Sequence, residues 1–109
     1  MKNIQAIEEF QALIRGEMPF CAVFSADWCK DCLVIKTVLK EIEEEYRGKY
    51  TFAVVDRDKF IDICHEYDVL GIPSFIIFKS GKALSTFISS RRKTRKEITD
   101  FLDNAAAGQ

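Results

Sequence analysis

Hydrophobic and polar positions along the chain form two kinds of pattern, one typical of helices and one typical of strands. Apolar residues recur at three- and four-residue steps between residues 4 and 14, which predicts a first helix with Asn3 as its cap and Gly16 at its end. Residues 20–25 then form a short continuous apolar run, typical of a strand covered on both faces. We therefore expect a helix followed directly by a central strand.

A second amphipathic stretch begins at Cys32. Its apolar residues again keep to three- and four-residue steps, while lysine and glutamate fall mostly on the other faces, so the pattern predicts one long helix that ends before Gly48. Residues 50–55 follow as another buried strand, which makes a right-handed parallel strand–helix–strand unit. The core-facing stripe consists of Ile35, Val38, Leu39, Ile42 and Tyr46.

The second half of the chain predicts two helices and a hairpin. Apolar spacing at residues 60–67 favours a short helix, and residues 74–78 and 83–88 favour two strands joined by a tight turn. Thr94 and Glu97 have the spacing of a capping box, which predicts that a last helix begins there.

This order of elements predicts an α/β fold with a central mixed sheet of about four strands and helices on both faces. We expect the strand at residues 20–25 in the middle, where the strand order reverses and ligand crevices form. A chain of 109 residues is far shorter than the length at which cores split, so we expect a single domain over residues 1–109.

Composition and charge exclude some classes of function. Hydrophobic residues make up 48% of the chain, enough to bury a core, and a formal net charge of -1 favours neither nucleic acid nor a membrane surface as a partner. The start lacks the pattern of a secretory signal, and no segment reaches membrane-spanning length. We expect a cytoplasmic monomer.

The chemistry of the chain is concentrated in its cysteines. Cys29 and Cys32 lie three residues apart, so on a helix they share a face and can close a disulfide. Cys29 falls in the first turn, where free amide N–H groups and the helix dipole stabilise a thiolate, so it is the candidate nucleophile. Cys32 begins the core-facing stripe and is the candidate resolving thiol. Cys21 and Cys64 lie in apolar patterns and are expected to be buried and inert.

A Cys-x-x-Cys pair also occurs in zinc sites, which need four ligands. Cys64 and His65 are the other candidate ligands, but adjacent helical residues point in different directions, so we predict no metal site. A purely structural role for the cysteine pair is the remaining alternative.

The segment Phe-Ser-Ala-Asp-Trp-Cys-Lys-Asp-Cys at residues 24–32, together with Gly-Ile-Pro-Ser at residues 71–74, resembles the thioredoxin family. The resemblance extends from residue 20 to about residue 102 and implies a thioredoxin fold without the extra first strand that some members have. It also implies a redox-active centre that needs no cofactor.

By this resemblance, Cys29 attacks, Cys32 resolves, Trp28 forms a wall of the site and Pro73 is a cis-proline that faces the cysteines. If Ile72 is extended before that proline, its backbone N–H and C=O can pair with a substrate peptide as an added strand. Such pairing confers affinity with little side-chain specificity.

Three departures from the family pattern are visible. Lys30 and Asp31 stand where typical members carry Gly-Pro; Lys30 favours and Asp31 opposes a Cys29 thiolate, so the net effect on the site is open. Val23 and Val54 stand where typical members place a buried aspartate and its partner lysine. Residues 89–96 are rich in arginine and lysine, which indicates either a solvated loop or an electrostatic guide for acidic partners.

The sequence therefore predicts a thiol-disulfide oxidoreductase that reduces protein disulfides in the cytosol and is re-reduced by a thioredoxin-reductase-like electron donor. One alternative is removal of low-molecular-weight thiols from protein mixed disulfides, which could need Cys29 alone at its first step. The other is a non-catalytic binding module with a thioredoxin fold.

Overall fold

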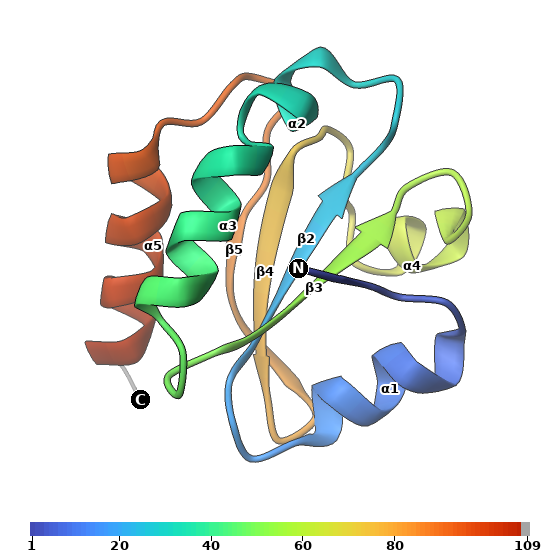
Figure 1. Cartoon of the computed structure of the whole chain (residues 1–109). Coiled ribbons are helices and arrows are strands. Elements are labelled where there is room, and N and C mark those ends of the chain that lie inside the picture. Colours follow the sequence, from blue (N-terminus) through green and yellow to red (C-terminus); the bar gives the residue numbers. More distant parts are fainter. Residues whose placement is uncertain (108–109) are drawn as a thin grey trace.

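A computed structural model describes residues 1–107 and shows a mixed sheet with helices on both faces (Figure 1). The strand order is β1-β3-β2-β4-β5; β2 pairs in parallel with β3 and antiparallel with β4, so the order reverses at β2. The strands are β1 (Lys2–Asn3), β2 (Phe20–Ser25), β3 (Thr51–Asp56), β4 (Ser74–Lys79) and β5 (Lys82–Phe87).

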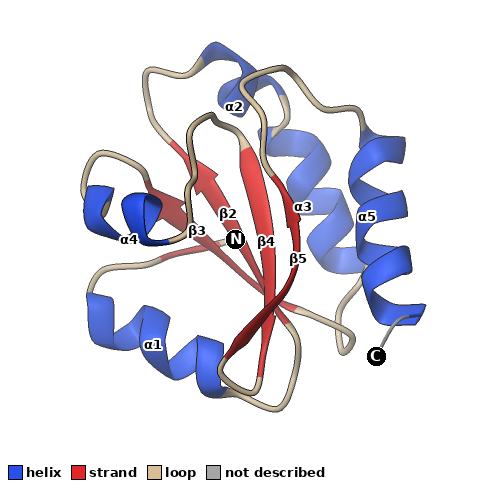
Figure 2. Cartoon of the chain, turned by 180° about the vertical axis from the view of Figure 1, so that it is seen from behind, coloured by secondary structure: helices blue, strands red, loops and turns tan. Residues whose placement is uncertain are grey.

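The helices cover the sheet in two pairs, with α1 and α4 on one face and α3 and α5 on the other (Figure 2). Side chains of β2 alternate between two buried clusters: Phe20 and Phe24 join the α1 side, whereas Cys21 and Val23 join the α3 side. The helices are α1 (Ile7–Arg15), α2 (Lys30–Val34), α3 (Lys36–Glu45), α4 (Ile61–Glu66) and α5 (Arg95–Ala107).

Ring packing and one buried hydrogen bond hold the helices to the sheet. Phe78 of β4 lies 5.6 Å from Phe10 of α1 and 5.1 Å from Tyr67, measured between ring centroids. On the other face, the Tyr50 hydroxyl donates to the Leu102 carbonyl oxygen at 2.6 Å, which ties α5 to the segment before β3. Each face of the sheet therefore has its own core.

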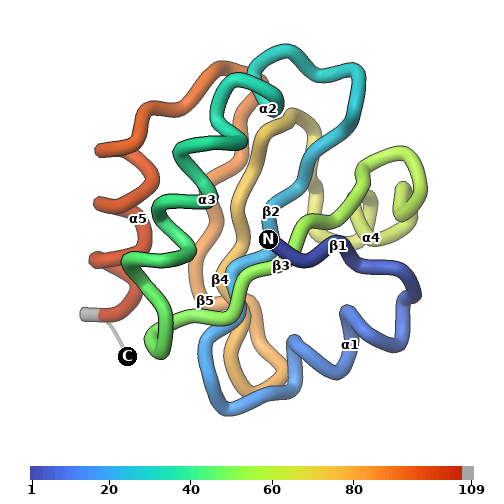
Figure 3. Tube along the Cα trace, in the orientation of Figure 1, coloured from blue at the N-terminus to red at the C-terminus, as the bar shows by residue number. Residues whose placement is uncertain are grey.

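The first strand is a correction to the sequence prediction. Asn3 does not cap α1, which begins at Ile7; instead Lys2 and Asn3 pair in parallel with β3, giving five strands rather than about four (Figure 3). Ile4 continues this pairing, since its N–H donates to the Val54 carbonyl at 2.9 Å and its side chain is buried. A two-residue strand is too short to produce a period-2 pattern, so periodicity assigned Ile4 to the helix.

The predicted long helix is also divided. α2 ends at Val34 and α3 begins at Lys36. Ile35, which lies between them, has φ of -85° and ψ of -1°. The break falls at two β-branched residues, Val34 and Ile35, whose side chains are restricted in a helix. Cys32 and Leu39 are both buried on either side of it, so the core-facing stripe survives the break.

The capping box is confirmed at the start of α5. The Thr94 N–H donates to Glu97 Oε1 at 2.9 Å, and the Glu97 N–H donates to Thr94 Oγ1 at 3.1 Å. The hydrogen bond from Arg91, together with the one from the Thr94 backbone, lowers the pKa of Glu97 to about 2. Glu97 thus stays ionised and keeps the cap closed at physiological pH.

Within residues 1–107, no helix is long and apolar enough to span a membrane. The predicted domain range runs to residue 109, and residues 108–109 lie outside the described part of the chain.

Candidate active site

The paired cysteines lie just beyond the carboxyl end of β2, where the strand order reverses. Cys29 is the N-cap of α2, and its Sγ accepts a hydrogen bond from the Cys32 N–H at 3.2 Å. The two cysteines form a disulfide with a Cα–Cα distance of 5.2 Å. The structure therefore brings together the pair that the spacing predicts.

Cys29 and Cys32 line different spaces. Cys29 lines an outer groove of about 500 Å³ together with Trp28, Gly71 and Ile72. Cys32 lines an inner cavity of about 190 Å³ between the sheet and the start of α3. In this disulfide-bonded state Cys29 is 8% and Cys32 is 5% exposed, so the two cysteines differ in the space they line more than in their exposure.

The loop between β3 and α4 holds Trp28 in place. The indole N–H donates to Asp58 Oδ2 at 2.6 Å, and the Arg57 guanidinium lies 5.9 Å from the ring centroid. Arg57 and Asp58 also form an ion pair at 3.0 Å. Sequence analysis missed Arg57 and Asp58, although they directly follow the strand next to β2, whose carboxyl end meets the same crevice.

The segment before β4 faces the cysteines from the other side. The Ile72–Pro73 peptide bond is cis, and the Ile72 carbonyl oxygen lies 4.0 Å from Cys29 Sγ. Leu70, which also lines the groove, is 89% exposed, and Trp28 is 63% exposed. The groove around Cys29 therefore has a backbone wall at Ile72 and two exposed apolar edges.

Comparison with known proteins identifies the chain's relatives. The sequence matches the thioredoxin family over residues 2–104. The chain belongs to the thioredoxin family. Its membership and its Cys29–Cys32 disulfide make it a thiol-disulfide oxidoreductase, and the thioredoxin fold predicted from the sequence is confirmed.

Three relatives show the range of the family's similarity to this chain. Thioredoxin C-2 of Corynebacterium nephridii is 32% identical over 88% of this chain and 88% of its own length. Chloroplastic thioredoxin X of Arabidopsis thaliana is 29% identical over 94% of this chain, but the chain spans only 57% of that protein. The crystal structure of thioredoxin from Trypanosoma brucei brucei has a TM-score of 0.78 at 29% identity, covering 93% of this chain and 89% of that one.

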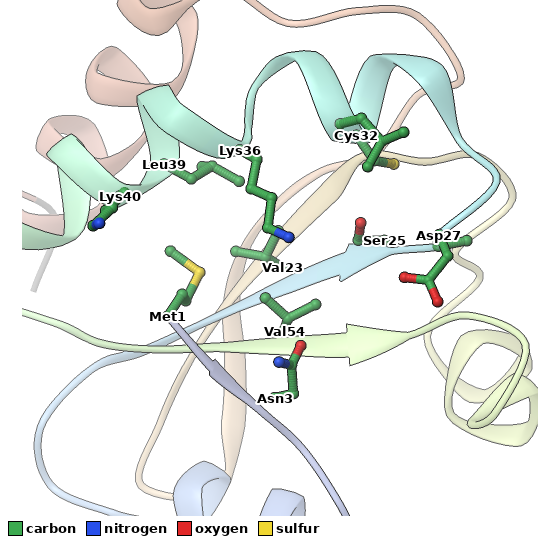
Figure 4. A pocket seen from close by; sticks show the side chains of 12 residues that line it. Met1, Asn3, Val23, Ser25, Asp27, Cys32, Lys36, Leu39, Lys40 and Val54 are labelled. Atoms are coloured by element: carbon green, nitrogen blue, oxygen red, sulfur yellow. The ribbon is translucent and has the colours of Figure 1, made fainter.

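Beneath the disulfide lie the two valines, Val23 and Val54, that the sequence analysis singled out. Val23 and Val54 are paired in register across β2 and β3, and Val23 is fully buried. Both line the inner cavity (Figure 4). The sheet under Cys32 therefore presents aliphatic side chains at these two positions.

The basic segment at residues 89–96 is not a free cationic strip. Lys93 is buried, and its ammonium donates to the carbonyl oxygens of Ser89 and Arg91, both at 3.0 Å; burial lowers the pKa of Lys93. The other four basic side chains pair with carboxylates: Arg91 with Glu97, Arg92 with Asp31, Arg95 with Glu41 and Glu45, and Lys96 with Asp100. Arg91, Arg92 and Lys96 are exposed, so most of the segment is solvated although its cations are paired, and its role as a guide for acidic partners stays a prediction.

One of these pairs reaches the cysteine motif. Arg92 Nε lies 3.0 Å from Asp31 Oδ1, a contact between residues 61 positions apart in the sequence. The Arg92 guanidinium therefore partly neutralises the Asp31 carboxylate, which directly precedes Cys32 in the sequence. Lys30, on the other side of Asp31 in the sequence, is exposed. Sequence analysis left the balance of Lys30 and Asp31 open because Arg92 could not be placed.

The remaining cysteines lie away from the groove. Cys21 and Cys64 are both buried and unpaired, as predicted, and burial raises the pKa of each thiol. His65, next to Cys64, is exposed. Within residues 1–107, no three or more histidine, cysteine or acidic side chains gather in a way that could hold a metal ion.

Close backbone packing shapes the groove wall at Gly71. A Cβ at Gly71 would lie 2.6 Å from the Ser90 nitrogen and 2.7 Å from the Ser89 carbonyl carbon. The Ser74 hydroxyl donates to the Gly71 carbonyl oxygen at 2.5 Å and fixes the turn from inside. Only glycine fits here without a backbone shift.

We expect Gly71→Ala to lower the free energy of unfolding by about 1–3 kcal/mol, because the methyl group must push two backbone segments apart. Gly16→Ala is the matched control: its Cβ would meet the Leu13 carbonyl oxygen at an ordinary 3.4 Å, so its effect should stay below about 1 kcal/mol. Urea unfolding of both variants measures the difference. Equal stability of Gly71→Ala and the unmodified protein would contradict this account of the groove wall.

Proposed function

We propose that this chain reduces disulfides of other proteins through Cys29 and Cys32 and that it acts in a reducing compartment, the cytoplasm. The observation that carries the proposal is the division of the two cysteines between the outer groove and the inner cavity. A substrate in the groove meets Cys29 first, while Cys32 stays behind it and 5.2 Å away by Cα distance.

Cys29 is the proposed nucleophile. In the reduced protein, the Cys32 N–H that now donates to Cys29 Sγ at 3.2 Å is available to a thiolate, and a hydrogen bond to the charged form favours it. The thiolate attacks one sulfur of a substrate disulfide. A mixed disulfide forms on Cys29, and the other substrate sulfur leaves as a thiolate.

Cys32 then completes the exchange. Its thiol loses a proton, attacks Cys29 Sγ and forms the Cys29–Cys32 disulfide seen here, and the bound substrate sulfur leaves as a thiolate. Two electrons have passed from the dithiol to the substrate. A separate reductase of the thioredoxin-reductase type must supply two electrons to restore the dithiol.

Substrate binding is proposed to use backbone more than side chains. The Ile72 carbonyl beside Cys29 can accept a hydrogen bond from an extended substrate segment, and Trp28 and Leu70 offer apolar contact on either side. Lys30 and Asp31 are proposed to tune the reactivity of Cys29. The chain is proposed to work as a monomer.

We expect wild-type protein to reduce insulin disulfides with dithiothreitol as donor, and Cys29→Ser to lose the activity by a factor of at least about one hundred. Cys32→Ser should accumulate a covalent adduct on Cys29, because attack proceeds and resolution does not. Mass spectrometry of the trapped complex identifies the linked cysteine.

Cys21→Ala and Cys64→Ala are the controls and should retain the activity, since both thiols are buried away from the groove. An adduct on Cys64 or Cys21 would refute the assignment. Full activity of Cys32→Ser on protein capped with glutathione would instead support removal of small thiols by Cys29 alone. If the wild type reduced no disulfide, the proposed activity would be wrong, and a non-catalytic binding module would be the remaining alternative.

The Arg92–Asp31 pair predicts opposite effects of two substitutions on Cys29. Both substitutions are made in the Cys32→Ser background. Asp31→Asn removes a negative charge that disfavours the Cys29 thiolate, so the pH midpoint of Cys29 alkylation should fall by a few tenths of a pH unit. Arg92→Met leaves the Asp31 carboxylate without its cation, so the midpoint should rise by a similar amount. Iodoacetamide labelling across a pH series gives both midpoints.

Asp100→Asn is the matched control, since its partner is Lys96 on the exposed face of α5 and its midpoint should not move. High salt should shrink both shifts, because these charges are partly exposed. Midpoints that move in the same direction for Asp31→Asn and Arg92→Met would show that the pair does not act on Cys29 through charge.

A further inference from the structure

Lys36, a lysine to which the sequence prediction gave no role, lines the inner cavity beside Cys32 and is also exposed to solvent. Val23 and Val54 of the sheet form the aliphatic floor of the cavity, and Leu39 of α3 lines it from the helix side. Figure 4 shows the Lys36 side chain extending from the start of α3 over Val23, and the Ser25 hydroxyl rising from β2 toward α2. Cys32 closes the same cavity from above.

Resolution of the mixed disulfide requires a negative charge on Cys32 Sγ, beside the inner cavity. Cys32 must become a thiolate before it attacks Cys29, yet it is only 5% exposed and the sheet beneath it is aliphatic. Burial in apolar surroundings disfavours a thiolate. A positive group that lines the same cavity offsets this cost.

Lys36 is the first residue of α3 and lies four positions after Cys32, the spacing at which helical residues share a face. Both residues line the cavity, one on each side of the break at Ile35. Among the described residues, Lys36 takes part in no ion pair, unlike most of the arginines near the active site. Its ammonium is therefore not neutralised by a neighbouring carboxylate.

We propose that Lys36 stabilises the Cys32 thiolate as it forms, a positioning charge for the resolving step in a chain that has valines at positions 23 and 54. The inference rests on the proposed function for its role in turnover. The proton of Cys32 leaves to solvent through the cavity, the thiolate displaces the substrate sulfur from Cys29, and Lys36 keeps its own proton throughout.

Other charges face the cavity from each surrounding element. Asp27 lies in the loop after β2 and opposes a thiolate; Lys40 lies one turn after Lys36, at the far end from Cys32 in Figure 4. The amino terminus at Met1 is 3.2 Å from the carboxylate of Glu43, which offsets it. Lys36 is thus the cation to test first, and Lys40 is its matched control.

The first test measures Cys32 without turnover. The ultraviolet absorbance of the Cys32 thiolate is followed against pH in the Cys29→Ser protein. The same measurement is made after adding Lys36→Met, Lys36→Arg or Lys40→Met to that protein. We expect Lys36→Met to raise the midpoint by about half to one pH unit, Lys36→Arg to restore it, and Lys40→Met to move it less than half as far. Burial raises the pKa of Cys21, Cys64 and the three tyrosines. The same titration of a Cys29→Ser/Cys32→Ser variant gives their signal, which is subtracted.

The second test measures turnover. Single-turnover decay of a mixed disulfide between Cys29 and a peptide should slow about threefold to tenfold near neutral pH in Lys36→Met and approach the wild-type rate at high pH, where Cys32 ionises unaided. An unmoved titration midpoint, or equal effects of Lys36→Met and Lys40→Met, would overturn the inference. If the wild type forms no mixed disulfide, the proposed function fails, while the titration still decides whether Lys36 acts on Cys32.

Discussion

The junction between β2 and α2 is the constraint on which the site depends. β2 is buried on both faces and lies where the strand order reverses, so the chain leaves the sheet at Ser25 into a crevice bounded by neighbouring loops. Four residues later Cys29 caps α2, and one helical turn brings Cys32 back over the sheet. The same turn that closes the disulfide also separates its members between an outer groove and an inner cavity.

Contacts from distant parts of the chain hold this junction. Asp58 binds the Trp28 indole, the Ile72 carbonyl lies beside Cys29, and Arg92 pairs with Asp31. Each contact comes from a different loop at the same end of the sheet. The groove is consequently shaped by tertiary packing as much as by the cysteine motif itself.

The parts of this design that sequence could predict are those with local causes. The apolar run at residues 20–25 matches β2, and the Thr94–Glu97 spacing gives the observed reciprocal cap. The cysteine spacing permits the disulfide for the same local reason. These features depend on residues within one turn or one strand of each other.

The missed features depend on partners far away in the sequence. β1 exists because β3 supplies its hydrogen bonds, and the basic segment is neutralised because glutamates of α3 and Asp31 of α2 lie across from it. The break at Ile35 leaves the apolar period intact, so periodicity alone could not reveal it.

The equilibrium reduction potential of the Cys29–Cys32 pair tests the central claim most directly. A dithiol that reduces protein disulfides must have a reduction potential low enough to pass two electrons to them. We predict a potential in the range of thioredoxins, about -270 mV, measured by equilibration with defined thiol–disulfide buffers. A potential near about -120 mV, the value of a strong periplasmic oxidant, would contradict the account, because such a pair donates its disulfide rather than its electrons.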